Sequence, residues 1–382
     1  MLVHICCSVD SHYFLQEMQK LYPNTPLTGF FYNPNIHPKE EYDLRLLDVK
    51  RSCAALKIPL LEGDYTLKSW MQAIKGLEQE PEKGKRCSAC FDARLEVSAR
   101  MALMLGLKQF STTLLSSPMK EQAVLKEQGE AIAKKYSLEF IYTNVRVCGG
   151  VEKQNALAKK DKLYRQNYCG CVFALEKQRQ VQNKPCIELI SPLNRQMHPA
   201  SVASRLELFK KRQELESQAQ NYHLLQQNLQ TYLLLRGWLC VNQHTIASHI
   251  LTHSNPKKVK IKDLQIAKIP LKPTLAEEML CARLGVKAPK ISITLGFSPK
   301  DDSLFIDIKS VSLLLNTPPT PLKDLRLTYE QELYLREKIA GVESVQAIFI
   351  VQDLNALVGG VLEVEIYSKV FEQKNFYLLA TS

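Results

Sequence analysis

The chain has 382 residues, a length that suits two or three domains of about 150 residues each. Lys and Arg number 50 against 39 Asp and Glu, so the net charge is +11, which suits a polyanionic partner such as nucleic acid. Apolar runs such as Ala347–Val351 are far shorter than the ~20 residues of a membrane span. Met1–Cys7 has no basic start of a secretory signal, so we expect a cytoplasmic protein that does not enter a membrane.

Up to about residue 185, short apolar runs alternate with longer amphipathic ones. We expect a helix over Pro38–Leu56 and strands at Leu2–Ile5, Leu27–Tyr32, Ile58–Leu61, Gln109–Leu115 and Leu138–Thr143. This alternation predicts an α/β fold, in which helices cover both faces of a parallel sheet. Ligands of such sheets bind beyond the carboxyl ends of the strands. Cysteines, asparagines and serines follow three of these strands directly, at Cys6-Cys7, Asn33-Pro34-Asn35 and Ser116-Ser117-Pro118.

The pattern changes near Cys186–Pro192, and we expect a domain over residues 1–188 and a second, α+β domain over residues 189–382. In the second domain, Ser201–Leu235 predicts one long polar helix or a helix pair. Strands are expected at Ile291–Leu295, Ser303–Ile308, Val345–Val351 and Val361–Tyr367, with a Pro-rich extended break at Asn316–Leu322.

The eleven cysteines are the most informative residues of the chain. An odd number of cysteines without a leader favours a reduced, cytoplasmic setting. Six of them form three tight groups, which are Cys6-Cys7, Cys87-x-x-Cys90 and Cys169-x-Cys171. The others are isolated, and for these we expect buried, unreactive thiols: Cys53, Cys148, Cys186, Cys240 and Cys281.

An adjacent cysteine pair together with a CxxC motif can supply four ligands to a metal centre. Such a set can bind either a structural zinc ion or a 4Fe–4S cluster, and the spacing alone favours neither of the two. A CxxC motif at the start of a helix also gains thiolate stabilisation from the helix N-terminus.

Five motifs follow one another along the first half of the chain, at His4–Ser11, Tyr32–Pro38, Arg86–Phe91, Ser111–Pro118 and Gln166–Cys171. Together and in this order, they resemble the QueH family of epoxyqueuosine reductases. The resemblance covers residues 1 to about 180, and it does not extend to the remainder of the chain.

The resemblance implies a Rossmann-like fold of the HUP class and a 4Fe–4S cluster beside a second iron ion. It also implies a tRNA substrate that carries epoxyqueuosine at the wobble position, and an electron donor that it does not identify. At the matching motifs of this chain, the resemblance implies that the cluster ligands are Cys6, Cys7, Cys87 and Cys90. Asp10 would bind the second metal or hold a proton, and Cys169 and Cys171 would bind the second metal or form a redox pair.

The implied reaction requires two electrons and two protons, because the epoxide oxygen leaves as water. A metal ion that binds the oxygen as a Lewis acid would help the C–O bond break, and a side chain must supply protons. Asp10, His37 and Tyr32 are candidate donors by residue type. Without the motifs, Asp10 would be interpreted as an ordinary N-cap of the first helix.

Basic residues predict where the tRNA phosphates bind. The stretch between Asn255 and Lys300 contains ten Lys and Arg residues and three acidic residues. It is either a solvated face or a docking surface for tRNA phosphates. Lys83, Lys85 and Arg86 beside the CxxC motif are candidates for contacts near the anticodon. For Arg45 and Arg94, phosphate binding and pairing with acids both remain open.

Two other functions compete with epoxide reduction. The first is an ATP-dependent tRNA sulfurtransferase, because Cys6–Ser11 occupies the place of the PP-loop motif. In this region the chain has cysteines where such enzymes have glycines. The flexible backbone loop that would bind pyrophosphate is therefore missing from the motif. The second is a non-catalytic, zinc-stabilised RNA-binding protein, which would be colourless where an iron–sulfur protein is brown.

Overall fold

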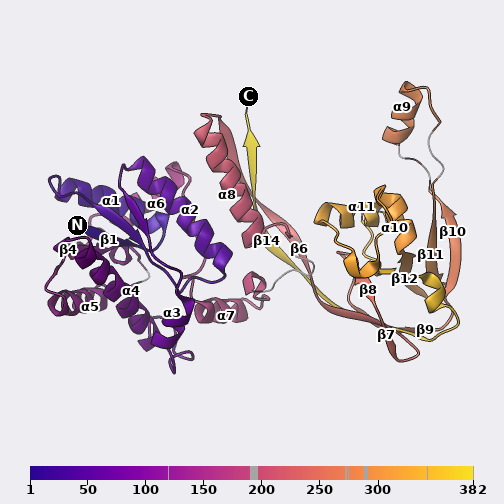
Figure 1. The fold of residues 1–382 in the computed structure, drawn as a ribbon, viewed down its shortest axis with the longest axis horizontal. Helices are drawn as coiled ribbons and strands as arrows, with labels where there is room; N and C mark the ends of the chain where they lie inside the picture. The colour runs from indigo at the N-terminus through magenta and orange to yellow at the C-terminus, as the bar shows by residue number, and fades with distance from the viewer. Residues whose placement is uncertain are drawn as a thin grey trace. The chain divides into compact units, whose positions relative to one another are not determined.

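The computed structural model describes residues 1–118, 120–189, 197–271, 273, 275–287, 291–341 and 343–381 (Figure 1). It divides into two compact units. The first contains residues 1–191, 200–227 and 375–382, and the second contains residues 192–199 and 228–374. Two long strands, β6 (Tyr222–Val241) and β14 (Leu362–Ala380), contribute residues to both units.

A five-stranded parallel sheet forms the centre of the first unit, in the order β3-β2-β1-β4-β5. Its strands are β1 (Leu2–Ile5), β2 (Thr28–Phe31), β3 (Leu60–Glu62), β4 (Gln109–Thr112) and β5 (Glu139–Phe140). The predicted α/β class is thereby confirmed. The strand expected over Gln109–Leu115 ends early, because Thr113–Leu115 turns into a 3-10 helix.

Helices surround this sheet, as Figure 1 shows. They are α1 (Ser8–Leu21), α2 (Lys39–Ala55), α3 (Leu67–Ala73), α4 (Lys85–Met104), α5 (Gln122–Lys135), α6 (Gly150–Lys160) and α7 (Val172–Val181). A further helix, α8 (Val202–Ser217), packs on α2 rather than on the sheet. Helix α1 packs beside α2, and α4 packs beside α5. Because crossover connections are right-handed, the two pairs fall on opposite faces of the sheet. The strand order reverses between β1 and β4, which is the place where such folds bind ligands.

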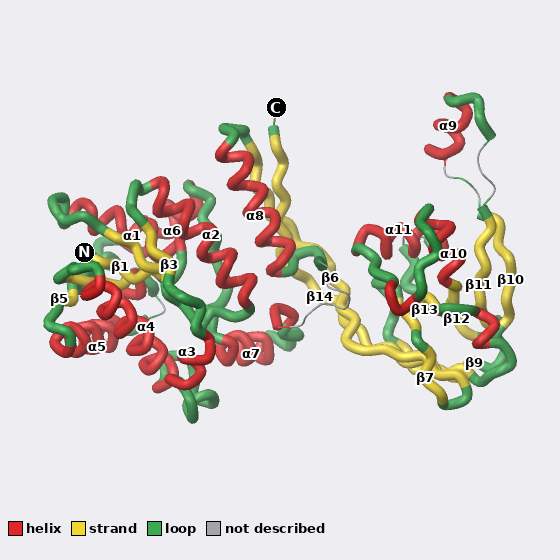
Figure 2. Tube along the Cα trace, in the orientation of Figure 1, coloured by secondary structure: helices red, strands yellow, loops and turns green. Residues whose placement is uncertain are grey.

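The second unit has α+β architecture, as predicted, with two sheets of mostly antiparallel strands (Figure 2). One sheet has the order β10-β11-β12-β13-β8, with strands at Gln265–Pro270, Ser292–Ser298, Asp301–Asp307, Ile348–Val351 and Ser248–Ile250. The other has the order β7-β6-β14-β9, in which β7 is His244–Ile246 and β9 is Lys257–Ile261. Its helices are α9 (Leu275–Arg283), α10 (Ile308–Leu315) and α11 (Tyr329–Ala340).

The helix expected over Ser201–Leu235 is wrong beyond Ser217, where α8 ends. The chain turns at Ala219, which has a positive φ of 53°, and β6 begins at Tyr222. Leucine and glutamine favour helices as isolated residues, but β6 lies between β7 and β14 in its sheet. Pairing with strands that are distant in sequence therefore overrides the local preference.

No helix in the described part of the chain has the length and apolar character to span a membrane. The division into domains 1–188 and 189–382 stays a prediction, and α8, which follows that boundary, packs with the first unit.

Helix α8 is attached to α2 by a buried ion pair. The Arg212 guanidinium lies against the Asp48 carboxylate, and both side chains are inaccessible to solvent. The same carboxylate accepts the Ser8 hydroxyl at 2.5 Å and the Tyr164 backbone N–H at 2.7 Å. Ser8 directly follows the adjacent cysteine pair, so α8 supports the segment that carries these cysteines.

Replacing Arg212 with Met should strongly destabilise the first unit, because it leaves the Asp48 charge buried without a cation. We expect the free energy of unfolding in denaturant to fall by about 3–5 kcal/mol. Adding Asp48→Asn should restore part of this loss.

The matched control is Arg51→Met, which breaks the more exposed pair of Arg51 with Glu216 between the same two helices. Its cost should be about 1 kcal/mol or less. Equal losses for Arg212→Met and Arg51→Met would contradict the role assigned to the buried pair.

Candidate metal centre

Two adjacent cysteines and a carboxylate meet where β1 ends and α1 begins. Cys7 is the N-cap of α1, and Asp10 lies in the first turn of that helix. The Cys6 Sγ is 3.8 Å from the Cys7 Sγ and 3.5 Å from the Asp10 Oδ2. All three ligand atoms lie within 4.8 Å of one another, and in the described part of the chain this is the one such group of three. Thr113, the first residue after the neighbouring strand β4, contacts the site, since its hydroxyl accepts the Cys6 backbone N–H at 3.2 Å.

The CxxC motif lies in the first turns of α4, which begins at Lys85. The Cys87 Sγ accepts the Lys83 backbone N–H at 3.2 Å, and the Cys90 Sγ accepts the Trp70 indole N–H at 3.3 Å. Hydrogen bonds to sulfur and the partial positive charge of a helix N-terminus both favour the thiolate. The motif is therefore placed to supply two sulfur ligands, while burial raises the pKa of the Cys87 thiol.

The CxC motif precedes α7, with Cys171 as the N-cap of that helix. The ammonium group of Lys120 donates to the Cys169 Sγ at 3.2 Å, while Cys171 packs in a buried cluster with Cys90. Gly170 has a φ of +107°, and a Cβ at this position would lie 2.9 Å from the Ile36 side chain. Only glycine suits the tight turn between the two cysteines.

Two buried cations lie among the cysteine groups. Burial opposes the charge of the Arg94 guanidinium, but nearby sulfur atoms outweigh burial and raise its pKa. These sulfur atoms belong to Cys90, Cys169, Cys6 and Cys87. Burial likewise opposes the charge of Lys120, and Cys169 raises its pKa. The charge of Arg94 therefore interacts with cysteines from all three motifs.

The two cations act mainly on Cys169. Burial alone would raise the pKa of its thiol, but the charges of Lys120 and Arg94 outweigh burial, so the pKa is lowered. Burial raises the pKa of the Cys171 thiol to about 11 and also raises the pKa of Cys87. In the metal-free protein, Cys169 is therefore the thiol of these three that ionises most readily.

Asp10 lies in an environment that favours its protonated form. Burial raises the pKa of the Asp10 carboxyl, although hydrogen bonds from Cys7, Cys6 and Gln154 partly oppose the shift. The Gln154 side-chain amide donates to the Asp10 Oδ1 at 2.9 Å, and the Ser116 hydroxyl donates to Gln154 at 2.5 Å. Because Cys7 is the N-cap of α1, the interpretation of Asp10 as an ordinary N-cap is wrong.

The other two candidate proton donors have partners of their own. The Tyr32 hydroxyl lies 2.8 Å from the Thr66 hydroxyl. The His37 Nδ1 lies 2.8 Å from the Asn35 carbonyl oxygen, and burial lowers the pKa of its imidazole. His37 is therefore neutral near pH 7.

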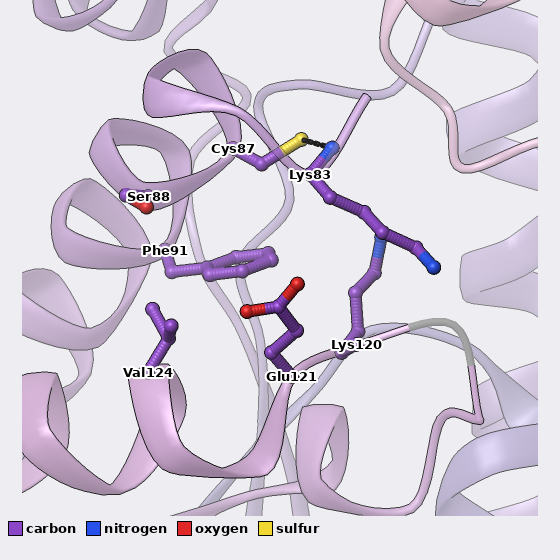
Figure 3. A pocket seen from close by; sticks show the side chains of 7 residues that line it. All are labelled: Lys83, Cys87, Ser88, Phe91, Lys120, Glu121 and Val124. Atoms are coloured by element: carbon purple, nitrogen blue, oxygen red, sulfur yellow. Dashed lines mark hydrogen bonds between the residues drawn. The ribbon is translucent and has the colours of Figure 1, made fainter. Parts of the chain in front are cut away.

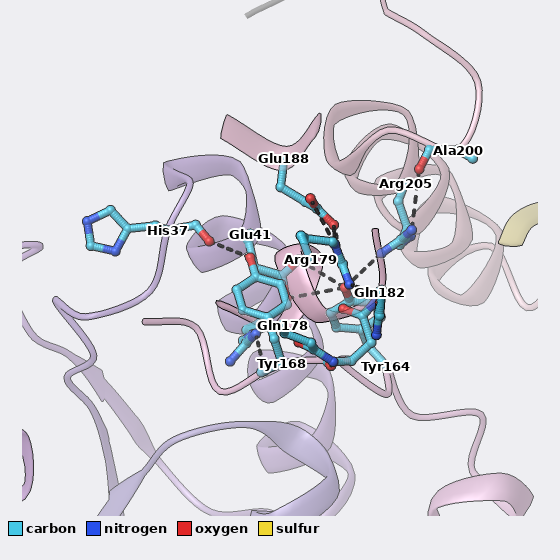
Figure 4. A network of polar contacts seen from close by, with 12 residues as sticks. His37, Glu41, Tyr164, Tyr168, Gln178, Arg179, Gln182, Glu188, Ala200 and Arg205 are labelled. Carbon is cyan, nitrogen blue, oxygen red and sulfur yellow. Dashed lines mark hydrogen bonds and ion pairs between the residues drawn. The ribbon is translucent and has the colours of Figure 1, made fainter. Parts of the chain in front are cut away.

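A network of buried polar groups holds the segment that carries Cys169 (Figure 4). The Arg45 guanidinium donates to the Glu41 carboxylate at 2.8 Å and to the Cys169 carbonyl at 3.1 Å. Tyr164 donates its hydroxyl to Glu41 at 2.9 Å and accepts from Arg205 of α8 at 3.0 Å. Arg45 thus pairs with an acid and supports the backbone, so it is not a free phosphate contact.

Two further arginines considered for phosphate binding are also buried. Arg86 donates to the Glu78 and Glu80 carbonyls, and Arg94 lies among the sulfur atoms. Lys83 and Lys85 remain exposed at the start of α4.

A small pocket lies beside the CxxC motif (Figure 3). Its lining combines a thiol, an aromatic ring and cations, from Lys83, Cys87, Ser88, Phe91, Lys120, Glu121 and Val124. Sequence reasoning missed Lys120, Gln154 and Trp70. The position of Lys120, two residues after the Ser-Ser-Pro motif beyond β4, was the one signal that could have identified it.

Replacing Lys120 with Met should raise the pKa of Cys169, because it removes the ammonium group at 3.2 Å. In the metal-free protein, alkylation of Cys169 at neutral pH should slow several-fold, as measured by mass spectrometry of the peptide that contains it. Lys126→Met, which removes an exposed lysine of α5, should leave the rate unchanged. An unchanged rate in Lys120→Met would show that the ion pair does not control this thiol.

Comparisons with known proteins agree with the five motifs. The family model "Epoxyqueuosine reductase QueH" matches residues 1–177. The epoxyqueuosine reductase QueH of Helicobacter pylori is 40% identical over 99% of this chain and 100% of its own length. The Thermotoga maritima relative is 35% identical over 47% of this chain and 92% of its own length. The Acinetobacter baylyi relative is 37% identical over 46% of this chain and 80% of its own length. The chain belongs to the epoxyqueuosine reductase QueH family.

Proposed function

We propose that this chain reduces epoxyqueuosine in tRNA to queuosine at a metal centre built from its three cysteine motifs. The observation that carries the proposal is the gathering of these thiols around Arg94 and Lys120, in a chain of the QueH family. A buried set of thiols with a carboxyl group offers the ligands that iron–sulfur centres use.

The residues present fit a cluster and a second ion. Cys6, Cys7, Cys87 and Cys90 are the proposed cluster ligands, and Asp10 is the proposed oxygen ligand of a second iron. Support comes from the 4.8 Å grouping of Cys6, Cys7 and Asp10 and from the thiolate-favouring contacts of the CxxC motif. The Arg94 Nη2 is buried without a hydrogen-bond partner among the described residues, as expected beside acceptors that the protein itself does not supply.

The reaction removes one oxygen atom as water and consumes two electrons and two protons. When bound, the iron centre supplies single electrons, drawn from a donor that remains unidentified, and a Lewis acid for the oxygen. The chain's own part is to deliver protons and exclude water. Asp10, whose pKa is raised by burial, holds a proton or binds the second iron, and Gln154 orients it through Oδ1.

Cys169 and Cys171 have different environments and therefore different proposed roles. Cys169 is the thiolate paired with Lys120, which suits a ligand of the second metal. Cys171, whose pKa is raised to about 11, would join it in a redox pair only as a neutral thiol. The small pocket beside Cys87, which Phe91 and Lys83 help to line, is a proposed contact for the substrate tRNA.

The direct test is reduction of tRNA that carries epoxyqueuosine. Anaerobically purified protein and a chemical reductant should convert it to queuosine, detected by mass spectrometry of the digested tRNA. If iron-loaded protein left epoxyqueuosine unchanged, the proposal would be wrong. A colourless zinc protein that bound the tRNA without reducing it would support the zinc-stabilised RNA-binding protein instead.

Cys87→Ser should abolish the visible absorbance of the cluster, because it removes one of the four proposed ligands. The control is Cys240→Ser, which changes a half-buried thiol on β6 of the second unit and should leave the absorbance intact. Iron content measured on both variants checks this prediction, and wild-type iron in Cys87→Ser would remove Cys87 from the ligand set.

Asp10→Asn keeps the size of the side chain and removes its acidic proton. Turnover should fall by about a hundred-fold or more, the usual contribution of a positioned proton donor, while most of the cluster absorbance survives. Gln16→Asn, a change on the same helix outside the cysteine groups, should retain activity. Wild-type turnover in Asp10→Asn would leave Asp10 without a role in the reaction.

A further inference from the structure

The second unit carries two aromatic rings and an arginine together on one face of the sheet β7-β6-β14-β9. Arg236 and Trp238 belong to β6, and Tyr367 belongs to β14. The Arg236 guanidinium lies 4.1 Å from the centre of the Tyr367 ring and 5.9 Å from that of Trp238. The three side chains form one group, which we call the aromatic platform.

The alternation of side chains along each strand turns this platform toward solvent. Leu239 on β6, and Val364 and Ile366 on β14, point the other way and are buried in the hydrophobic core. On the platform side, Arg236 is exposed and 44% of the Tyr367 surface is accessible. Trp238 is half-buried, and neither ring belongs to that core, so their position on this face calls for another explanation.

The lysines of the neighbouring strand do not provide a free basic surface. On β9, Lys258 pairs with Glu365 at 3.0 Å and Lys260 pairs with Glu363 at 2.6 Å. Lys257 is largely buried and binds Asp301. The charge surplus counted between Asn255 and Lys300 is thus partly neutralised, and docking of phosphates on these lysines stays a prediction.

Arg236 differs from these lysines because no carboxylate in the described part of the chain pairs with it. A guanidinium that lies over the Tyr367 ring and near the Trp238 ring offers a planar surface and a positive charge without a paired carboxylate. Unpaired RNA bases stack on aromatic rings and on arginine planes, and the charge attracts the adjacent phosphates. The chemistry of the platform therefore fits a single-stranded segment of RNA.

The family comparison gives this surface a context. The Thermotoga and Acinetobacter relatives match just under half of this chain over most of their own length. The family model covers residues 1–177, so the second unit lies outside the part that it describes. We propose that Arg236, Trp238 and Tyr367 bind unpaired bases of the substrate tRNA by stacking, as a second contact outside the metal centre. This proposal rests on the proposed function for the identity of the RNA.

Binding of an unmodified tRNA transcript to the full chain tests the platform, and this measurement needs neither epoxyqueuosine nor metal. Tyr367→Leu and Trp238→Leu should each weaken the Kd about ten-fold, the usual loss when a stacked base loses its ring. The slope of log Kd against log salt should stay unchanged in both, because no phosphate contact is removed. Arg236→Gln should weaken binding and also reduce the slope.

Two variants separate stacking from damage to the fold. Tyr367→Phe keeps the ring and should bind as tightly as the wild type. Tyr334→Leu, on α11, removes another partly exposed ring that lies near a lysine and should not affect the Kd. If Tyr367→Phe lost as much affinity as Tyr367→Leu, or if Tyr334→Leu lost as much, stacking on the platform would be refuted.

Trp238 also provides a direct signal. The only other tryptophan, Trp70, is buried in the first unit, so quenching of the half-buried Trp238 indole by tRNA should vanish in Trp238→Leu. Wild-type affinity in both leucine variants would overturn the platform and leave the reductase proposal intact. If the wild-type protein fails to reduce epoxyqueuosine while the platform variants lose tRNA affinity as predicted, only the reductase proposal is overturned.

Discussion

Negative sulfur in a buried site requires positive charge nearby, and this constraint organises the first unit. Arg94 and Lys120 supply that charge from α4 and from the loop before α5. Leaving either cation buried among neutral groups would cost several kcal/mol, so each stabilises the ionised sulfur and is stabilised by it. The parallel sheet brings the required segments together, because β1 and β4 are neighbours and end at the same edge.

A second layer of buried ion pairs keeps these segments in place. Asp48 joins the start of α1 to α8 through Arg212, and Glu41 joins the Cys169 segment to α8 through Tyr164 and Arg205. Helix α8 therefore belongs structurally to the first unit, although it follows the part that matches the family model. The chain beyond this helix is where the proposed tRNA contact through the aromatic platform lies.

Sequence reasoning identified the parallel sheet because its strands are short apolar runs with strong local signals, as at Leu2–Ile5. The cysteine motifs were recognisable for a similar reason, since their spacing is local. Lys120 and Gln154 were missed because their partners are 49 and 144 residues away along the chain. Strand β6 was mistaken for helix because only its pairing with distant strands reveals it. Likewise, the count of lysines near Lys257 could not show the acids on the neighbouring strand β14 that pair with Lys258 and Lys260.

The central claim is that the three cysteine motifs form one iron-containing centre around Arg94 and Lys120. The most direct measurement is iron and acid-labile sulfide per chain in anaerobically purified protein, combined with electron paramagnetic resonance of the reduced form. The account predicts that the protein contains acid-labile sulfide and that the reduced form gives the resonance signal of a cluster. It also predicts more iron than sulfide per chain, because the second ion adds iron without sulfide. Protein that folds with zinc and without acid-labile sulfide would contradict it.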